Sequence, residues 1–266
     1  MSALLGSYAF LLGAVVGSFL NVVIHRYPLG ESIVFPASRC PGCKARIRAW
    51  DNVPIVSYLL LLGRCRDCKK PISSRYPLVE LSNALFYLAV FLRTGLSIAF
   101  LPLAMIVSMT LVLIYIDFDI QILPDVVDLP GIALGLLIGW LRLGDGRLNL
   151  MLASDLLDSV LGAALGAAIL LAIALLYKLI RKIEGMGMGD VKMMAMIGAV
   201  TGWRPIPAVL FVASFAGAAA GILLALREKQ GLQIALPFGV FLGLSFLTIV
   251  FFGRQLGTWY AAALLS

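Results

Sequence analysis

Acidic side chains stand beside apolar runs at two places along the chain. The stretch IYIDFDIQILPD contains Asp117, Asp119 and Asp125, and the stretch GMGMGD ends at Asp190. Carboxylates within or at the edge of hydrocarbon are costly, so each needs an account. Two carboxylates held together do not both ionise readily, and one keeps a proton while the other acts as a base on water. Such a pair can cut a peptide bond at a membrane surface.

Helix capping is the alternative account of two of these carboxylates. Asp125 follows Pro124 and Asp190 follows Gly189, and each precedes an apolar run, so each can be an N-cap. Asp117 falls at the C-terminal end of its predicted helix, where a negative charge meets the unfavourable end of the dipole, so a cap does not explain it. Asp119 lies roughly 200° around the helix from Asp117, so these two are not expected to share a face.

Three alternating glycines at positions 185, 187 and 189 precede Asp190. Glycine lets another backbone approach closely and permits φ values that other residues resist, so the stretch leaves room for an extended peptide. Small residues equally allow helices to pack tightly, and this alternative stays open. A nucleotide-binding loop is disfavoured, because the stretch lacks a preceding strand and the GxxxxGK spacing.

All four cysteines lie in one polar segment, as CPGC at 40–43 and CRDC at 65–68. Two C-x2-C pairs at this separation resemble a zinc ribbon, in which each pair supplies two thiolates from a tight turn. A pair of disulfides or four idle thiols are the alternatives. Four thiolates leave no open position on the metal, so the sequence predicts a structural zinc site formed by Cys40, Cys43, Cys65 and Cys68.

The elements that carry these residues are those of a membrane protein. Of 266 residues, 61% are hydrophobic and 13% are charged, a composition that water-soluble domains do not sustain. The apolar runs have the length of helical spans and show no strand alternation, which predicts an all-α polytopic membrane protein with about eight transmembrane helices. These spans are expected at residues 3–24, 78–96, 98–116, 126–143, 157–179, 190–203, 205–226 and 235–252.

Lysine and arginine predict the orientation and the division of the chain. Residues 25–77 carry ten of the 21 lysines and arginines, and with eight alternating spans sixteen fall on one face, which is therefore cytoplasmic with the N-terminus outside. Both carboxylate groups lie at that face. The net charge of +7 then requires no nucleic acid. The expected parts are a first helix at 1–24, a four-cysteine zinc-binding lobe at 25–77 and a bundle at 78–266 that contains the protease site.

Several stretches together resemble the bacterial type IV prepilin peptidase family. The matching stretches occur in the family's order and cover nearly the whole chain; they are GSFLNVVIHRYP (17–28), the two cysteine pairs, NVPIVSYLLLLGRCRDCKKPISSRYPLVE (52–80), IDFDIQILPD (116–125), GMGMGDVK (185–192) and LPFG (236–239). The resemblance implies a GxGD-type aspartic endopeptidase of the bacterial inner membrane. Its substrates are the prepilins and pseudopilins of type IV pili and type II secretion, whose short basic leader is removed after a glycine.

The resemblance also assigns roles to residues. Asp117 and Asp190 match the family's catalytic aspartates, and Asp125 is the runner-up. Gly187, Gly189 and Lys192 have supporting roles, with Lys192 shaping the site or only reaching toward headgroups. The new N-terminal residue is expected to be methylated with S-adenosylmethionine, for which Glu80 is a weak candidate ligand; Ala84 stands where relatives often have glycine.

Two other classes of function are alternatives to this one. A proton-coupled transporter also places aspartates in a membrane, and a non-catalytic scaffold of a secretion system needs no carboxylate pair. A serine or histidine triad is disfavoured because His25 is the only histidine in the chain,. The intact aspartate pair favours the protease.

Overall fold

The computed structural model describes residues 2–144, 148, 150–183, 186–228 and 236–265. Every named element in these ranges is a helix, so the predicted all-α class is confirmed. The chain forms two compact units, Met1–Val112 and Leu113–Ser266, and the division falls within helix α4 (Phe100–Ile120). The predicted division at residues 24 and 77 stays a prediction.

Five helices among the described residues are long and apolar enough to cross a membrane, and the chain is a multi-pass membrane protein. They cover Ala3–Leu29, Phe100–Ile120, Leu156–Arg181, Ile206–Leu226 and Phe238–Thr258. The other three predicted spans fall on α3 (Arg75–Thr94), α5 (Asp125–Trp140) and α7 (Met188–Thr201). These three helices fall short of the same combination of length and hydropathy, so the count of eight is not confirmed.

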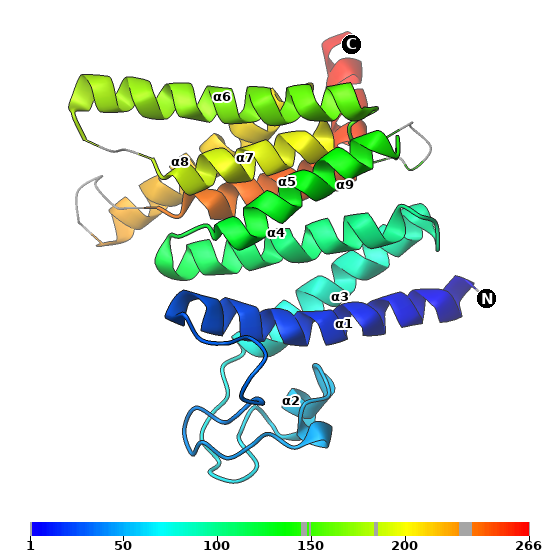
Figure 1. Ribbon diagram of the computed structural model, residues 1–266, viewed down its shortest axis with the longest axis vertical. Coiled ribbons are helices and arrows are strands. Elements are labelled where there is room, and N and C mark those ends of the chain that lie inside the picture. The colour runs from blue at the N-terminus through cyan, green and yellow to red at the C-terminus, as the bar shows by residue number, and fades with distance from the viewer. Residues whose placement is uncertain (1, 145–147, 149, 184–185, 229–235, 266) are drawn as a thin grey trace. The chain divides into compact units, whose positions relative to one another are not determined.

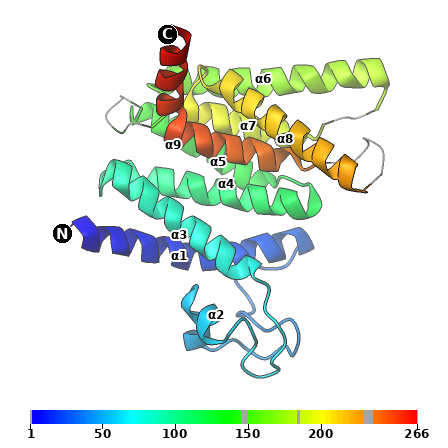
Figure 2. The ribbon, with the colours of Figure 1, turned by 180° about the vertical axis from the view of Figure 1, so that it is seen from behind.

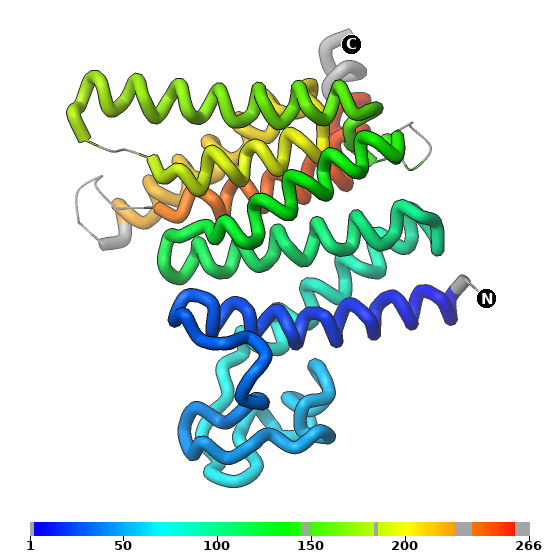
Figure 3. Tube along the Cα trace, in the orientation of Figure 1, coloured from blue at the N-terminus to red at the C-terminus, as the bar shows by residue number. Residues whose placement is uncertain are grey.

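In the first unit, α1 (Ser2–Arg26) packs against α3 along a row of small residues. A Cβ atom at Gly13 would lie 2.8 Å from Cα of Ala84, and one at Gly17 would lie 2.8 Å from Cα of Glu80. Glycine therefore allows the two backbones to approach. The side chain of Asn83 joins the helices by donating to the Gly13 carbonyl at 2.7 Å. Figure 3 traces the long segment between these helices, which carries only the short elements η1 (Tyr27–Leu29), η2 (Ala49–Asp51) and α2 (Val56–Leu60).

In the second unit, α7 is the central helix. It contacts α5, α6 (Leu156–Arg181), α8 (Ile206–Glu228) and α9 (Phe238–Leu265); α5 and α6 lie toward the viewer in Figure 1, and α8 and α9 in Figure 2. Apart from Lys192, every residue from Val191 to Thr201 is buried. The length of α7, about 21 Å, is less than the thickness of the hydrocarbon core of a membrane. The four neighbouring helices enclose α7. The sequence positions Asp190 at the start of this buried helix.

Candidate functional site

Asp117 lies near the end of α4 and is held by the start of α9. Its side chain is buried, and its Oδ2 atom accepts a hydrogen bond from the backbone N–H of Val240 at 2.9 Å. The backbone N–H of Gly239 donates to the same carboxylate. The first N–H groups of a helix have no partner within that helix and attract anions. Asp117 therefore occupies the unfavourable end of its own helix and the favourable end of another.

Gly239 is required for this contact, because a Cβ atom there would lie 2.9 Å from Oδ2 of Asp117 and 3.0 Å from Cδ1 of Leu123. The glycine of the LPFG stretch thus leaves space for the carboxylate. Asp119, two residues beyond Asp117, is exposed. The expectation that Asp117 and Asp119 do not share a face is confirmed.

Asp190 is half-buried and is the third residue of α7. The N-cap position is Gly187, and its backbone N–H donates to the Asp190 carboxylate. Asp190 therefore accepts this N–H in the way that the acidic residue of a capping box does. The alternative in which Asp190 is itself the N-cap is therefore wrong by three residues. Gly189 leaves space for a neighbour, since a Cβ atom there would lie 2.8 Å from Cβ of Leu123. Gly185 lies outside the described residues.

Asp117 and Asp190 interact electrostatically. Leu123 lies next to both Gly189 and Gly239. Its side chain therefore packs against the residue before Asp190 and against the glycine that lies beside the Asp117 carboxylate. The structure thus brings together two residues that are 73 positions apart (190 − 117) in the sequence. Two neighbouring carboxylates can share one proton, and such a pair can activate a water molecule.

Asp125 makes a different kind of contact. It is the first residue of α5, after Pro124 in the N-cap position, whose side chain makes no capping hydrogen bond. The N-cap alternative for Asp125 is therefore wrong by one residue. Both oxygens of Asp125 lie 2.7 Å from Nζ of Lys192, and the side chains are 55% and 34% exposed. Lys192 is an ion-pair partner of Asp125, so it does not only extend toward headgroups.

Asp128 is a residue that the sequence reasoning missed. It lies three residues after Asp125, is 0% exposed, and interacts electrostatically with Asp125, Lys192 and Asp190. The signal was present, because Asp128 is a charged residue inside the apolar run that begins at residue 126,. We call Asp117, Asp125, Asp128 and Asp190 the aspartate cluster.

The four cysteines converge as predicted. Their sulfur atoms all lie within 4.8 Å of one another, and the Sγ atoms of Cys40 and Cys68 are 3.8 Å apart. Tetrahedral zinc with Zn–S bonds of about 2.3 Å separates its sulfurs by about 3.8 Å, whereas a disulfide requires about 2.05 Å. The cysteines are free, so the geometry fits a metal and not the disulfide alternative.

The two cysteine pairs form matching turns. Lys44 donates its backbone N–H to the Cys40 carbonyl at 2.9 Å, and Lys69 donates to the Cys65 carbonyl at 3.0 Å. Both lysines have positive φ, near 60°. The backbone N–H of Cys43 makes the largest of several hydrogen-bond contributions that lower the pKa of Cys40 to about 7. At Cys43 the backbone hydrogen bond of Ala45 lowers the pKa, but desolvation and the other three thiols together raise it to about 11. The thiolate, which is the form that binds zinc, is therefore favoured first at Cys40.

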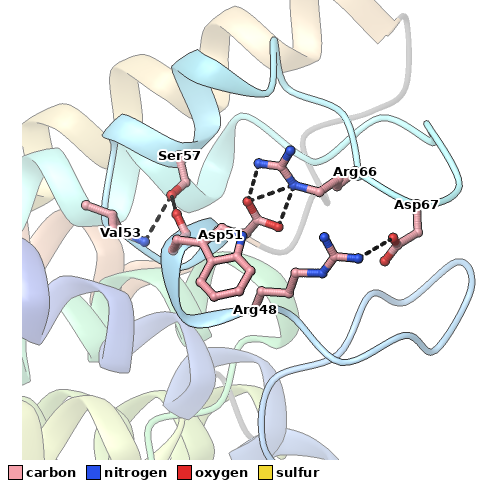
Figure 4. A network of polar contacts seen from close by, with 7 residues as sticks. Arg48, Asp51, Val53, Ser57, Arg66 and Asp67 are labelled. Atoms are coloured by element: carbon pink, nitrogen blue, oxygen red, sulfur yellow. Dashed lines mark hydrogen bonds and ion pairs between the residues drawn. The ribbon is translucent and has the colours of Figure 1, made fainter.

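Two ion pairs fix the second turn to the segment before α2 (Figure 4). Arg66 makes three contacts of 2.7 to 3.0 Å with the carboxylate of Asp51 and lowers the pKa of that carboxyl group. Arg48 lies 3.5 Å from Asp67. Ser57 closes the same segment, since its hydroxyl donates to Trp50 O and accepts from Val53 N, both at 3.0 Å. Arg66 and Asp67, the two residues between the cysteines of CRDC, therefore position the metal site.

Glu80 has a structural partner. It is buried near the start of α3, and its Oε2 accepts the backbone N–H of Ile55 at 2.7 Å. Ile55 has φ 62° and ψ −52°, a strained conformation for a β-branched residue,. Glu80 thus holds the strained turn before α2. Ala84 is fully buried against α1.

Comparisons with known proteins cover both units. The model of the bacterial peptidase A24 N-terminal domain matches residues 11–94, and that of the type IV leader peptidase family matches residues 104–222. A prepilin leader peptidase/N-methyltransferase of Pseudomonas putida is 38% identical, over 93% of this chain and 91% of the relative. Proteins of the same name from Burkholderia pseudomallei (strain 1026b) and Aeromonas hydrophila are 37% and 34% identical, over 93% and 96% of this chain and 85% and 93% of theirs. No solved structure matches significantly.

Proposed function

Because the chain belongs to the type IV leader peptidase family, we propose that it removes the short basic leader from prepilins and pseudopilins after a glycine. The new N-terminal residue is then methylated, in keeping with the names of its relatives. The enzyme is a prepilin peptidase of the aspartic type. Its roles are those of type IV pilus assembly and type II secretion.

Asp117 and Asp190 are the catalytic pair of this proposal. The observation that carries it is the placement of two carboxylates on either side of Leu123, which packs against Gly189 and Gly239; each carboxylate also accepts backbone N–H groups at the start of a helix. One carboxyl group holds the shared proton and donates it to the scissile carbonyl, while the other takes a proton from water as the water attacks. The backbone N–H donors keep both groups oriented. The exposed Gly187 leaves room for an extended substrate backbone beside Asp190, whereas the space at Gly189 is taken by Leu123.

The protein lies in the bacterial inner membrane with eight spans, its N-terminus outside and its active site at the cytoplasmic face. The distribution of lysine and arginine supports this orientation. Burial of α7 among four helices supports counting this short helix as a span, because α7 is surrounded by protein and not by lipid. The apolar helix of the substrate then enters laterally while its leader stays in the cytoplasm.

Zinc is held by Cys40, Cys43, Cys65 and Cys68, and its role is structural. Four thiolates fill the coordination sphere, so the ion supplies folding energy to a segment with little core of its own.

The residue suggested for S-adenosylmethionine does not fit that role in this conformation. Glu80 is buried and its Oε2 atom holds the Ile55 N–H, so its side chain is part of the folded core and is not open to a ligand.

The test is cleavage of a prepilin in liposomes, with mass spectrometry of the new N-terminus. Asp117→Asn and Asp190→Asn should each lose roughly ten-thousand-fold in rate, as loss of one member of a catalytic set does. Asp125→Asn and the exposed control Asp119→Asn should still cut. A product heavier by about 14 Da shows methylation. If Asp125→Asn fails while Asp117→Asn cuts, the pair is assigned wrongly by one carboxylate; if all four variants cut like the wild type, the protein is not an aspartic protease of this kind.

A further inference from the structure

Asp128 is a buried carboxylate to which the cleavage mechanism gives no role. Its side chain is 0% exposed, and neither of its oxygens has a hydrogen-bond partner within the described part of the chain. A buried polar or charged group without a partner is costly. Such groups are rare in native structures, and each deserves an explanation.

Two glycines fix how α5 and α7 lie against each other. A Cβ atom at Gly131 would lie 2.9 Å from Cγ of Met196, and one at Gly135 would lie 2.7 Å from Cβ of Ala199. The contact moves from Gly131 to Gly135 on α5 as it moves from Met196 to Ala199 on α7. The two helices therefore run parallel. Side chains at spacings of three and four residues share a helix face and lean toward its N-terminus.

Asp128 and Lys192 lie one turn earlier along this contact. Asp128 is three residues before Gly131 on α5, and Lys192 is four residues before Met196 on α7. The electrostatic interactions of Asp128 with Lys192, Asp125 and Asp190 agree with this placement. Asp128 therefore lies between the two helices, close to the beginning of α7 that carries Asp190.

The charges in this region are unevenly paired. Lys192 gives its contacts to Asp125, whose side chain is 55% exposed, and ion pairs in contact with water are worth little. Asp128 is fully buried and has no hydrogen-bond partner among the residues that the structure describes, although such a partner is worth far more in a low-dielectric environment. The flexible four-carbon side chain of lysine can turn its ammonium group from one carboxylate to the other.

We propose that Lys192 exchanges between two carboxylates, the exposed Asp125 and the buried Asp128, and that Asp128 is a positioning residue that draws the ammonium group inward beside Asp190. In the inward position Lys192 supplies a counter-charge to the catalytic pair, which carries one shared negative charge during the reaction. The role of this exchange in catalysis rests on the proposed function; the exchange itself does not.

The catalytic part is tested by a double-mutant cycle on prepilin cleavage, with Asp128→Asn, Lys192→Met and the double variant. Asp128→Asn should lower kcat about tenfold and leave KM within about twofold, and the double variant should be no slower than Lys192→Met, because both changes remove the same interaction. Asp125→Asn is the matched control and should lose less than about threefold. If the losses of the single variants multiply in the double variant, or if Asp125→Asn and Asp128→Asn are equally slow, Asp128 does not act through Lys192.

The exchange is tested separately by treating the intact, liposome-embedded protein with sulfosuccinimidyl acetate and measuring acylation of the peptide that contains Lys192 by mass spectrometry after digestion. Asp128→Asn should be acylated at Lys192 several-fold faster than the wild type, because the inward position is lost. Asp125→Asn should be acylated more slowly, because the lysine then stays inward. The opposite order, or equal rates, would overturn the proposal. This readout holds even if the wild type cleaves no prepilin, a result that would reject the proposed function alone.

Discussion

The replacement Gly239→Ala should separate the geometry of the catalytic carboxylate from the stability of the fold. The added methyl group would lie 2.9 Å from Oδ2 and 3.0 Å from Cγ of Asp117, distances at which one of the two must move. The backbone of α9 cannot yield easily inside the bundle, so the carboxylate is displaced from the Val240 N–H that it now accepts at 2.9 Å.

The magnitude follows from that hydrogen bond. Hydrogen bonds to charged groups contribute about 1.5–3 kcal/mol, and each 1.36 kcal/mol corresponds to a factor of about ten in rate. If the bond orients Asp117 for the reaction, kcat for prepilin cleavage should fall about 10- to 150-fold. KM should change little, because Asp117 acts on the scissile bond and does not hold the substrate.

Two glycines of α9 are controls for this experiment. Beyond its own stretch of helix, no atom of the described residues lies within 4 Å of a Cβ at Gly257, so Gly257→Ala should cleave at the wild-type rate. A Cβ at Gly243 would lie 2.5 Å from Cγ1 of Ile114, so Gly243→Ala should lower the thermal unfolding temperature in detergent through overpacking. Wild-type cleavage by a folded Gly239→Ala protein would refute the claim that backbone N–H groups orient Asp117 for catalysis.

The remaining predictions concern the metal site and the turn before α2. Cys40→Ser should lose the bound zinc found by elemental analysis of the wild type, and wild-type protein without zinc would contradict the assignment. Arg66→Met should release zinc to a chelator faster than Arg48→Met, because Arg66 makes three short contacts with Asp51 whereas Arg48 lies 3.5 Å from its partner; equal rates would remove the role given to Arg66. Glu80→Ala should destabilise the first unit by about 1–3 kcal/mol, since the Ile55 N–H loses its acceptor, whereas Glu80→Gln keeps an acceptor oxygen and should be milder in thermal unfolding.

The cysteine pairs show what local spacing can predict. Each turn closes within six residues, from Cys40 to Ala45 and from Cys65 to Lys70, so the pattern itself contains the geometry. The same holds for the all-helical class, which follows from apolar runs without strand alternation. The number of spans depends on more than local composition, because α7 is short and enclosed by other helices.

The aspartate cluster could be predicted only in part. The cost of carboxylates in apolar surroundings identified Asp117, Asp125 and Asp190, because each lies at the edge of an apolar run,. Asp128 stands among valine and leucine, and the same rule applied to it with equal force. Its burial depends on the approach of α7 at Gly131 and Gly135, which the sequence of α5 alone does not reveal.

The partner of Asp117 was beyond local reasoning altogether. The Val240 N–H that holds it lies 123 residues away in the sequence. Because the donor is a backbone group, the type of side chain at position 240 does not reveal it. The sequence did indicate that Asp117 needs a partner, since a carboxylate at the C-terminal end of a helix interacts unfavourably with that helix's dipole. Such a residue needs a compensating positive end, and the start of a second helix supplies it without a charged side chain. An acidic residue at the wrong end of an apolar helix therefore predicts that another helix begins beside it, and the glycine of an LPFG stretch marks where that helix can approach.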